Sequence, residues 1–221
     1  MFFKAIIFDL DGTLLDTLED LGNAMNSILA KNNLPTHNID TYRNFVGDGV
    51  EMLVTRALPC DKTNSDAIRT YTRAFRDEYD RGWNVKTKPY DGIGELLNEL
   101  KLRGLKIAVL SNKPDIYTNR CVSEFLSNWE FDMVLGQQDS FPKKPDPAGA
   151  IRISKYLKIT HENIIYLGDT ATDMQTAIVA GMYPVGALWG FRSEKELQEN
   201  GAKALVKKPQ DILEILSFKT V

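Results

Sequence analysis

Short apolar runs alternate along the chain with segments of helical periodicity, and this alternation limits the possible folds more than any other feature of the sequence. The runs, rich in β-branched and aromatic residues, cover residues 5–8, 106–110, 132–135, 164–167, 184–188 and 204–206. Between them, apolar residues recur at helical spacing, as in residues 93–100 and 117–125. Strands that alternate with helices predict parallel βαβ units. We therefore expect an α/β fold built on a doubly wound parallel sheet.

Residues 16–87 interrupt this alternation. Helical patterns cover residues 18–29, 41–58 and 65–79, and the sequence between them contains no strand pattern. An insert of this length is too long for a loop, so it predicts a second, mostly helical domain after the first strand. The expected domains are a core of residues 1–15 and 88–221 and a helical domain of residues 16–87.

The overall charge and the cysteines narrow the classes of partner and compartment. The chain has 27 Lys and Arg against 30 Asp and Glu, a net charge of −3, so we expect no broad basic surface and no nucleic-acid partner. Cys60 and Cys121 stand alone, which is typical of a reducing compartment. The first residues lack a signal-peptide pattern, and no apolar run approaches the ~20 residues that cross a membrane. We expect a cytoplasmic protein with no membrane partner.

Two acidic pairs follow predicted strands. Asp9 and Asp11 come directly after the run 5–8, where two neighbouring carboxylates would repel each other and lose hydration. Asp169 ends another run, with Asp173 on the same face of the helix that follows. An Asp–Gly turn and a helix cap are the alternatives, but neither explains both pairs. No His or Cys lies near them in the sequence, so the pattern favours a hard, oxygen-binding cation such as Mg²⁺.

Two further groups would suit an anion. Ser111 and Asn112 follow a third strand, where a hydroxyl and backbone N–H groups can bind an anion. Lys144, directly before Pro145, would add a compact positive charge. Taken alone, Ser111 also fits a helix N-cap and Lys144 a surface lysine. Carboxylates, a metal ion, a hydroxyl and an ammonium at one edge of a sheet are the groups that phosphoryl transfer through an aspartyl-phosphate needs.

The ordered motifs resemble those of the haloacid dehalogenase-like hydrolase superfamily. They are DxDGTL (residues 9–14), SN (111–112), KP (144–145) and GDxxxD (168–173), and they extend over nearly the whole chain. The resemblance implies a Rossmann-like core that carries the active site. It also implies that the helical insert is a mobile cap over that site.

Position by position, the resemblance assigns roles to the site residues. Asp9 resembles the nucleophile that attacks phosphorus, and Asp11 the acid that protonates the leaving alcohol and then the base that activates water. The groups that hold the phosphoryl are expected to be Ser111, Asn112 and Lys144. The expected Mg²⁺ ligands are Asp9, Asp169 and the backbone carbonyl of Asp11. Asp173 is expected to bind the ion directly or through water, or to act only as a partner of Lys144.

The insert suggests a substrate. Residues 44–58 are similar to the caps of phosphoglycolate phosphatases, with a VGxG turn and a helix that ends in Arg-Ala-Leu. Gly47, Gly49, Arg43 and Arg56 are therefore candidate substrate contacts, although a plain turn with solvated charges fits them as well. We expect a Mg²⁺-dependent phosphatase that acts on a small phosphorylated metabolite, with phosphoglycolate first, as a monomer or homodimer.

Other functions use similar groups. A phosphomutase or a pyrophosphatase of the same superfamily would keep the whole site. A haloacid dehalogenase would need neither Asp11 nor Asp169. A phospho-receiver domain, which is a signalling module and no enzyme, shares the aspartate, Mg²⁺ and lysine but runs to about half this length and has no large insert.

Overall fold

The computed structural model describes residues 3–217, so residues 1–2 and 218–221 of the expected core lie outside the described residues. The chain forms two compact units. The core unit consists of Met1–Leu15 and Pro89–Val221, and the insert unit of Asp16–Lys88. The chain passes between them twice, through the two-residue strands β2 (Leu15–Asp16) and β3 (Lys88–Pro89), which pair with each other.

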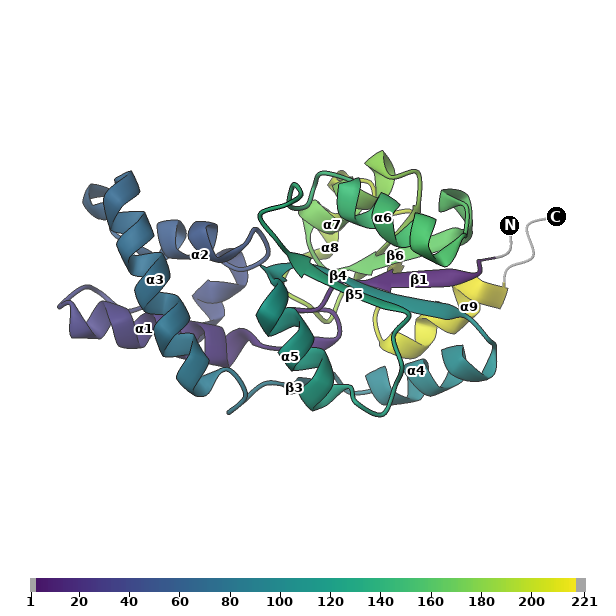
Figure 1. Cartoon of the computed structure of the whole chain (residues 1–221), viewed down its shortest axis with the longest axis horizontal. Coiled ribbons are helices and arrows are strands. Elements are labelled where there is room, and N and C mark those ends of the chain that lie inside the picture. Colours follow the sequence, from purple (N-terminus) through teal and green to yellow (C-terminus); the bar gives the residue numbers. More distant parts are fainter. Residues whose placement is uncertain (1–2, 218–221) are drawn as a thin grey trace. The chain divides into compact units, whose positions relative to one another are not determined.

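The core unit is built on a six-stranded sheet in the order β5-β4-β1-β6-β7-β8, in which all neighbouring strands are parallel (Figure 1). The strands are β1 (Ala5–Phe8), β4 (Lys106–Pro114), β5 (Met133–Gln137), β6 (Ile164–Gly168), β7 (Tyr183–Ala187) and β8 (Ala204–Val206). The helices are α4 (Ile93–Leu102), α5 (Asp115–Phe125), α6 (Ala148–Leu157), α7 (Ala171–Val179), α8 (Glu194–Glu199) and α9 (Ile212–Ser217). The predicted doubly wound, Rossmann-like sheet is confirmed.

Helices cover both faces of this sheet, which is why its strands are mostly apolar. All four residues of β1 are buried. Ile7 and Tyr166 belong to a cluster with Ala150, Ile153 of α6 and Ala177 of α7. Residues of the opposite parity point to the other face, where α4 and α9 lie (Figure 1). A strand buried on both faces needs a continuous apolar run, and this requirement made the strands visible in the sequence.

The insert unit is helical in the structure. Its helices are α1 (Leu18–Lys31), α2 (Val50–Ala57) and α3 (Ser65–Gly82), with 3₁₀ turns at Ile39–Asn44 and Cys60–Lys62. The long helix α3 packs against α1 and α2. Its N-cap is Asn64, whose side chain accepts a hydrogen bond from Ala67 N. The helix buries the stacked rings of Phe75 and Tyr79.

The stretch 41–58, predicted as helix, is only partly helical. A 3₁₀ turn ends at Asn44, and α2 begins at Val50. Gly47 (φ 119°) and Gly49 (φ 90°) lie between them with a backbone conformation that other residues rarely adopt. These two glycines break the helical periodicity and form a loop, which we call the glycine loop (residues 45–49).

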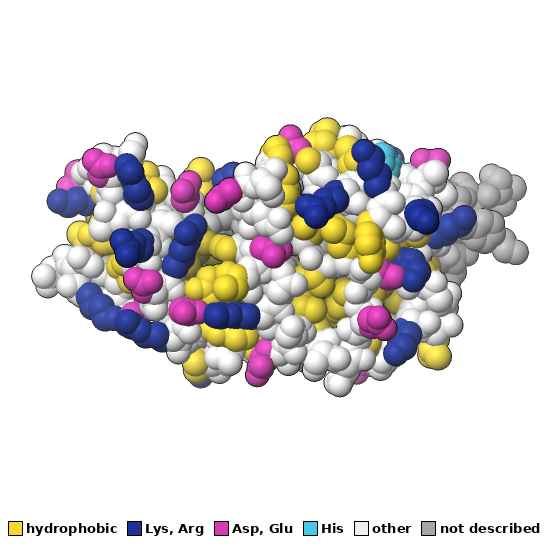
Figure 2. All heavy atoms as spheres, viewed as in Figure 1, with side chains coloured by type: hydrophobic (Ala, Val, Ile, Leu, Met, Phe, Trp, Pro, Cys, Tyr) yellow, Lys and Arg dark blue, Asp and Glu magenta, His cyan; other side chains and the backbone are white. Residues whose placement is uncertain are grey.

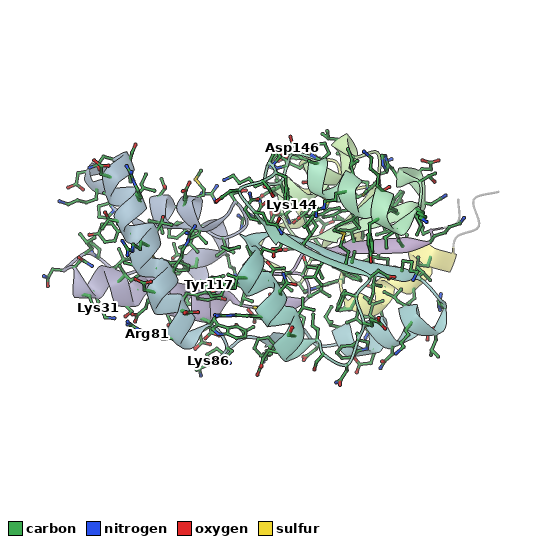
Figure 3. All side chains as sticks on the ribbon, in the orientation of Figure 1. Lys31, Arg81, Lys86, Tyr117, Lys144 and Asp146 are labelled. Atoms are coloured by element: carbon green, nitrogen blue, oxygen red, sulfur yellow. The ribbon has the colours of Figure 1, made fainter. Side chains whose placement is uncertain are left out.

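A buried carboxylate joins the two ends of the insert unit. Asp20, in the first turn of α1, is 3% exposed. Its oxygens accept hydrogen bonds from Lys86 N (2.9 and 3.0 Å), Thr87 N (2.8 Å) and Thr87 Oγ1 (2.8 Å); Lys86 is labelled in Figure 3. Because hydrogen bonds to a charged acceptor are strong when water is excluded, Asp20 fixes the segment that leads back to the core unit.

Both charge signs occur side by side on the face shown in Figure 2, where Lys and Arg alternate with Asp and Glu. Within residues 3–217, the helices do not combine the length and the apolar character that crossing a membrane requires.

We expect Asp20→Asn to lower the thermal midpoint by several degrees. The amide turns an NH₂ group toward backbone donors, which costs about 1–3 kcal/mol, and 1 kcal/mol corresponds to about 2–4 °C for a chain of this size. Asp66→Asn is the control, because that side chain is 91% exposed and paired with Arg69 on the surface. Equal midpoints for the two variants, measured by circular dichroism, would contradict the anchoring role of Asp20.

Candidate active site

The polar residues predicted for the core unit lie at the carboxyl ends of three neighbouring strands, β4, β1 and β6, and in the loop after β5. Asp9 follows β1 and donates its N–H to Leu167 O of β6 (2.9 Å). On the other side of β1 lies β4, paired in parallel register from Lys106 to Val109. From β1 the chain first builds the sheet toward β5 and then returns to the other side at β6. This reversal is the topological switch point at which ligands bind in open α/β sheets.

Lys144 lies between two buried carboxylates. Its Nζ is 2.8 Å from Asp9 Oδ1 and 2.7 Å from Asp173 Oδ1. The three side chains are at most 6% exposed. Figure 3 labels Lys144 with Asp146 of the same loop between β5 and α6. Lys143 is exposed, so the structure brings Lys144 and not Lys143 to the acidic residues, and the surface-lysine alternative is excluded.

Asp169 is held from two sides. Its Oδ1 accepts a hydrogen bond from Thr13 Oγ1 (2.8 Å), which is 156 positions away in the chain, and its Oδ2 accepts one from Phe191 N (2.8 Å). The backbone at Gly12 approaches Asp169 so closely that a Cβ at this position would clash with Asp169 Oδ2. These contacts fix the direction of the Asp169 carboxylate.

Asp173 combines a structural and an electrostatic role. Its Oδ2 accepts hydrogen bonds from Thr170 N (3.0 Å) and Thr170 Oγ1 (2.6 Å), in a capping box that begins α7. Its Oδ1 faces Lys144. Helix capping and pairing with Lys144 are therefore both present, each through one oxygen of the same carboxylate.

Ser111 and Asn112 lie inside β4, near its carboxyl end, and do not begin a helix. The strand continues to Pro114, and α5 begins only at Asp115, so the N-cap alternative for Ser111 is wrong. Ser111 Oγ accepts a hydrogen bond from Lys113 N (3.2 Å). The Asn112 side chain exchanges two hydrogen bonds with the backbone of Lys144 (2.8 and 3.2 Å). Asn112 thus holds the loop that places Lys144 in the site.

Asp11 forms a buried ion pair that the sequence analysis did not predict. Lys113 Nζ lies 3.0 Å from Asp11 Oδ1 and 3.3 Å from Asp11 Oδ2. The two side chains are 3% and 11% exposed. Lys113 follows the SN motif directly, but its spacing gives no indication of its partner, which comes from the neighbouring strand end.

Burial and mutual repulsion change the protonation of these groups. Burial raises the pKa of Asp9 to about 7; Lys144 opposes the shift, and Asp173 and Asp11 add to it. Burial also raises the pKa of Asp169 well above its usual range, with a further increase from Asp173 and Asp9. Burial alone would lower the pKa of Lys144, but Asp173 and Asp9 outweigh it and raise the pKa well above the usual value. The ammonium therefore stays charged.

Three of these carboxylates could hold a metal ion. Ligand oxygens of Asp9, Asp169 and Asp173 all lie within 4.8 Å of one another, and the three residues are buried. Asp9 Oδ1 has no partner in hydrogen-bond geometry, although Lys144 is close. Oxygen ligands alone, a buried oxygen without a hydrogen-bond partner and the raised pKa values of Asp9 and Asp169 fit a hard divalent cation. The side chain of Asp11 is not among the three, and the sequence analysis assigned only its carbonyl to the metal.

The remaining candidates belong to the insert unit. Gly47 and Gly49 shape the glycine loop, and Arg56 of α2 binds this loop through Asp48 Oδ2 (2.6 Å) and the carbonyls of Asn44 and Phe45. Arg43 lies 3.5 Å from Asp40 and is partly exposed. The structure thus gives Arg56 a role within the insert unit, and the predicted substrate contacts of these four residues stay a prediction.

Comparison with known proteins identifies the family. The family model for haloacid dehalogenase-like hydrolases matches residues 6–187. A phosphoglycolate phosphatase of Nitrosospira multiformis is 32% identical over 92% of this chain and 91% of its own length. One of Psychrobacter arcticus is 33% identical over 89% and 88%. A crystal structure from Lactobacillus delbrueckii subsp. bulgaricus, provisionally named a phosphoglycolate phosphatase, has a TM-score of 0.92 at 30% identity and covers 98% and 99% of the two chains.

We expect the stability of the cation-free protein to fall, relative to Asp9→Asn, as the pH rises from about 4 to about 7. Asp9 holds its proton to about pH 7 when folded but only to about 3.8 when unfolded, so the folded state loses this advantage across that window. A divalent cation competes with the same proton, so its stabilising effect should be larger at about pH 8 than at about pH 5. Thermal midpoints with chelator and with added cation measure both effects. If the midpoints of the wild type and of Asp9→Asn, measured with chelator, change with pH in parallel, the role given to the Asp9 proton is contradicted.

Proposed function

The chain belongs to the haloacid dehalogenase-like hydrolase family and is a phosphatase, and from this premise we propose that it hydrolyses a small phosphomonoester through an aspartyl-phosphate on Asp9. The observation that carries this mechanism is the buried position of Asp9, 2.8 Å from the Lys144 ammonium and beside two further carboxylates. A buried anion next to a fixed cation is arranged to receive a second anion, the phosphoryl group.

In the first step, an oxygen of Asp9 bonds to phosphorus and the bond from phosphorus to the alcohol oxygen breaks. Asp11 gives its proton to that oxygen, so a neutral alcohol leaves. Asp11 then takes a proton from water, the water oxygen bonds to phosphorus, and the bond to Asp9 breaks. Phosphate and the free carboxylate of Asp9 are regenerated, and Asp11 is protonated again.

The phosphoryl group needs positive charge and hydrogen-bond donors around it. We assign the positive charge to the Lys144 ammonium. We assign the hydrogen-bond donors to the Ser111 hydroxyl and to Asn112 of β4. Lys144 suits the role because its pKa is raised and it stays charged. In a buried site its attraction for the phosphoryl oxygens is stronger than it would be in water.

We propose Mg²⁺ as the metal ion. Asp9, Asp169 and the carbonyl of Asp11 would bind it, with Asp173 acting directly or through water. When bound, Mg²⁺ neutralises phosphoryl charge and allows the anionic Asp9 to approach phosphorus. The all-oxygen donor set supports this choice over zinc or copper.

Phosphoglycolate is the first-choice substrate. Two relatives that match about nine-tenths of this chain are named phosphoglycolate phosphatases. We propose that the glycine loop, with Gly47, Gly49, Arg43 and Arg56, contributes to substrate choice and that the insert unit acts as a cap on the core unit. A phosphomutase or pyrophosphatase reaction is the alternative that uses the same site. Asp11 and Asp169 disfavour a dehalogenase, which needs neither.

We also propose a cytoplasmic location. Cys60 is exposed, Cys121 is buried and neither belongs to a disulfide, which suits a reducing compartment. The expected partner is a small phosphorylated metabolite, and the protein is proposed to work as a monomer or homodimer.

We expect release of inorganic phosphate from a panel of phosphorylated metabolites, strongest with phosphoglycolate and abolished by chelator. Asp9→Asn should lower kcat by at least about 10⁴-fold, because the bond to phosphorus cannot form. Asp11→Asn should lower it by about 10²–10⁴-fold, the usual contribution of general acid–base catalysis. Substantial activity of the Asp9 variant on any good substrate would refute the mechanism. Recovery of the phosphoryl group on an isomer of the substrate, with no free phosphate, would favour a mutase.

We expect Arg43→Gln and Arg56→Gln to raise KM for phosphoglycolate more than KM for p-nitrophenyl phosphate, because only the first carries an additional carboxylate. Arg69→Gln, in an exposed ion pair of the same unit, is the matched control. Equal effects of Arg43→Gln or Arg56→Gln on both substrates would mean that the arginine acts within the insert unit and does not contact the substrate.

A further inference from the structure

Lys113 is a buried lysine that none of the motifs accounts for. Its ammonium is 3.0 and 3.3 Å from the two oxygens of Asp11. The backbone of Lys113 is fixed as well, because its N–H donates to Ser111 Oγ (3.2 Å) and its carbonyl accepts from Thr118 Oγ1 of α5 (3.0 Å). A rigid segment of β4 therefore presents this ammonium to Asp11.

Stability does not explain such a pair. Removing two charges from water costs as much as or more than their attraction returns, so apolar residues often replace a buried ion pair without loss of stability. Geometry gives a better reason. The outer torsion of an aspartate side chain is broad, and a cation that contacts both oxygens limits it to one orientation. A group that transfers a proton loses about 10²-fold in rate when it is misplaced by about 1 Å.

We propose that Lys113 is a positioning residue that holds the carboxyl group of Asp11 in line with the oxygen of the leaving alcohol. The inference rests on the proposed function, in which Asp11 protonates that oxygen. Lys113 itself neither bonds to phosphorus nor transfers a proton. Its effect acts through Asp11 and should appear only in reactions that need the proton.

The choice of leaving group shows whether an effect of Lys113 acts through the proton of Asp11. An alkyl phosphomonoester such as phosphoglycolate must release an alcohol, so its cleavage needs the proton from Asp11. The p-nitrophenolate ion leaves without a proton, so transfer of its phosphoryl group to Asp9 does not. The parameter kcat/KM covers only the steps up to departure of the leaving group and excludes hydrolysis of the aspartyl-phosphate. The ratio of kcat/KM for the alkyl phosphate to kcat/KM for p-nitrophenyl phosphate therefore measures proton delivery, whatever the fraction of active protein.

The experiment measures this ratio in Lys113→Met, Lys113→Gln, Lys113→Arg and Asp11→Asn, with the best alkyl phosphomonoester of the panel that carries no charge besides its phosphate. Phosphoglycolate is left out of the ratio because its carboxylate also responds to the loss of a positive charge. We expect Lys113→Met to lower the ratio by about 10–100-fold and Lys113→Arg, which keeps the charge, to restore most of it. Lys113→Gln serves if the Met variant does not fold. Lys106→Met is the control: Lys106 lies at the other end of β4 and pairs with Asp132 at 2.6 Å, and the ratio should stay at the wild-type value.

The outcomes are distinguishable. A lower ratio in both Asp11→Asn and Lys113→Met, with recovery in Lys113→Arg, supports the inference. A lower ratio in Asp11→Asn alone overturns it and leaves the proposed function intact. An unchanged ratio in Asp11→Asn refutes the acid role of Asp11 and the inference with it. A fall of kcat/KM by the same factor for both substrates in Lys113→Met assigns the lysine a merely structural role and also overturns the inference.

Discussion

The Lys144 ammonium between Asp9 and Asp173 is the interaction on which the site depends. Three acidic residues with buried oxygens within 4.8 Å of one another would repel strongly without a cation. Lys144 reduces that repulsion, and it is held by Asn112 from a different strand end. Removing one partner from such a buried pair costs about 3–5 kcal/mol, because the other charge is left uncompensated. In the proposed mechanism, the cation that allows the acidic residues to coexist also attracts the phosphoryl group.

The parallel sheet makes this arrangement possible with few residues. The carboxyl ends of β1, β4 and β6 lie side by side because the strands pair in register. Thr13 and Asp169 meet across 156 positions for this reason. Asp173 shows how closely site and fold are joined, since one of its oxygens completes the capping box of α7 and the other faces Lys144. A substitution there would change the start of a helix and the charge of the site together.

The sequence predicted the parts of the molecule whose physics is local. Buried strands need continuous apolar runs, so 5–8 and 204–206 were predicted with the bounds that the structure has. The pairing of Lys144 with Asp173 was among the expected roles of Asp173, but other contacts made by tertiary structure were not predicted. The spacing of Lys113 says nothing of Asp11, and the Phe191 N–H reaches Asp169 only because the loop after β7 folds back. Ser111 fitted a helix cap by composition, but β4 continues past it. The helix predicted across 41–58 breaks at Gly47 and Gly49, whose positive φ values no periodicity reveals.

The two units also differ in how far their residues define chemistry. In the core unit, the buried charges of Asp9 and Lys144 pair with each other, and the proposed reaction uses both of them. In the insert unit, Arg56 binds Asp48 and the Phe45 carbonyl of the glycine loop and the carbonyl of Asn44, which directly precedes the loop. Such a residue can shape a loop without touching a ligand. Residues that carry a reaction and residues that select a substrate can therefore lie in different parts of one fold. In the proposed function, substrate choice depends on the shape of the glycine loop as much as on the charges beside it, because Gly47 and Gly49 allow a backbone path that other residues would strain.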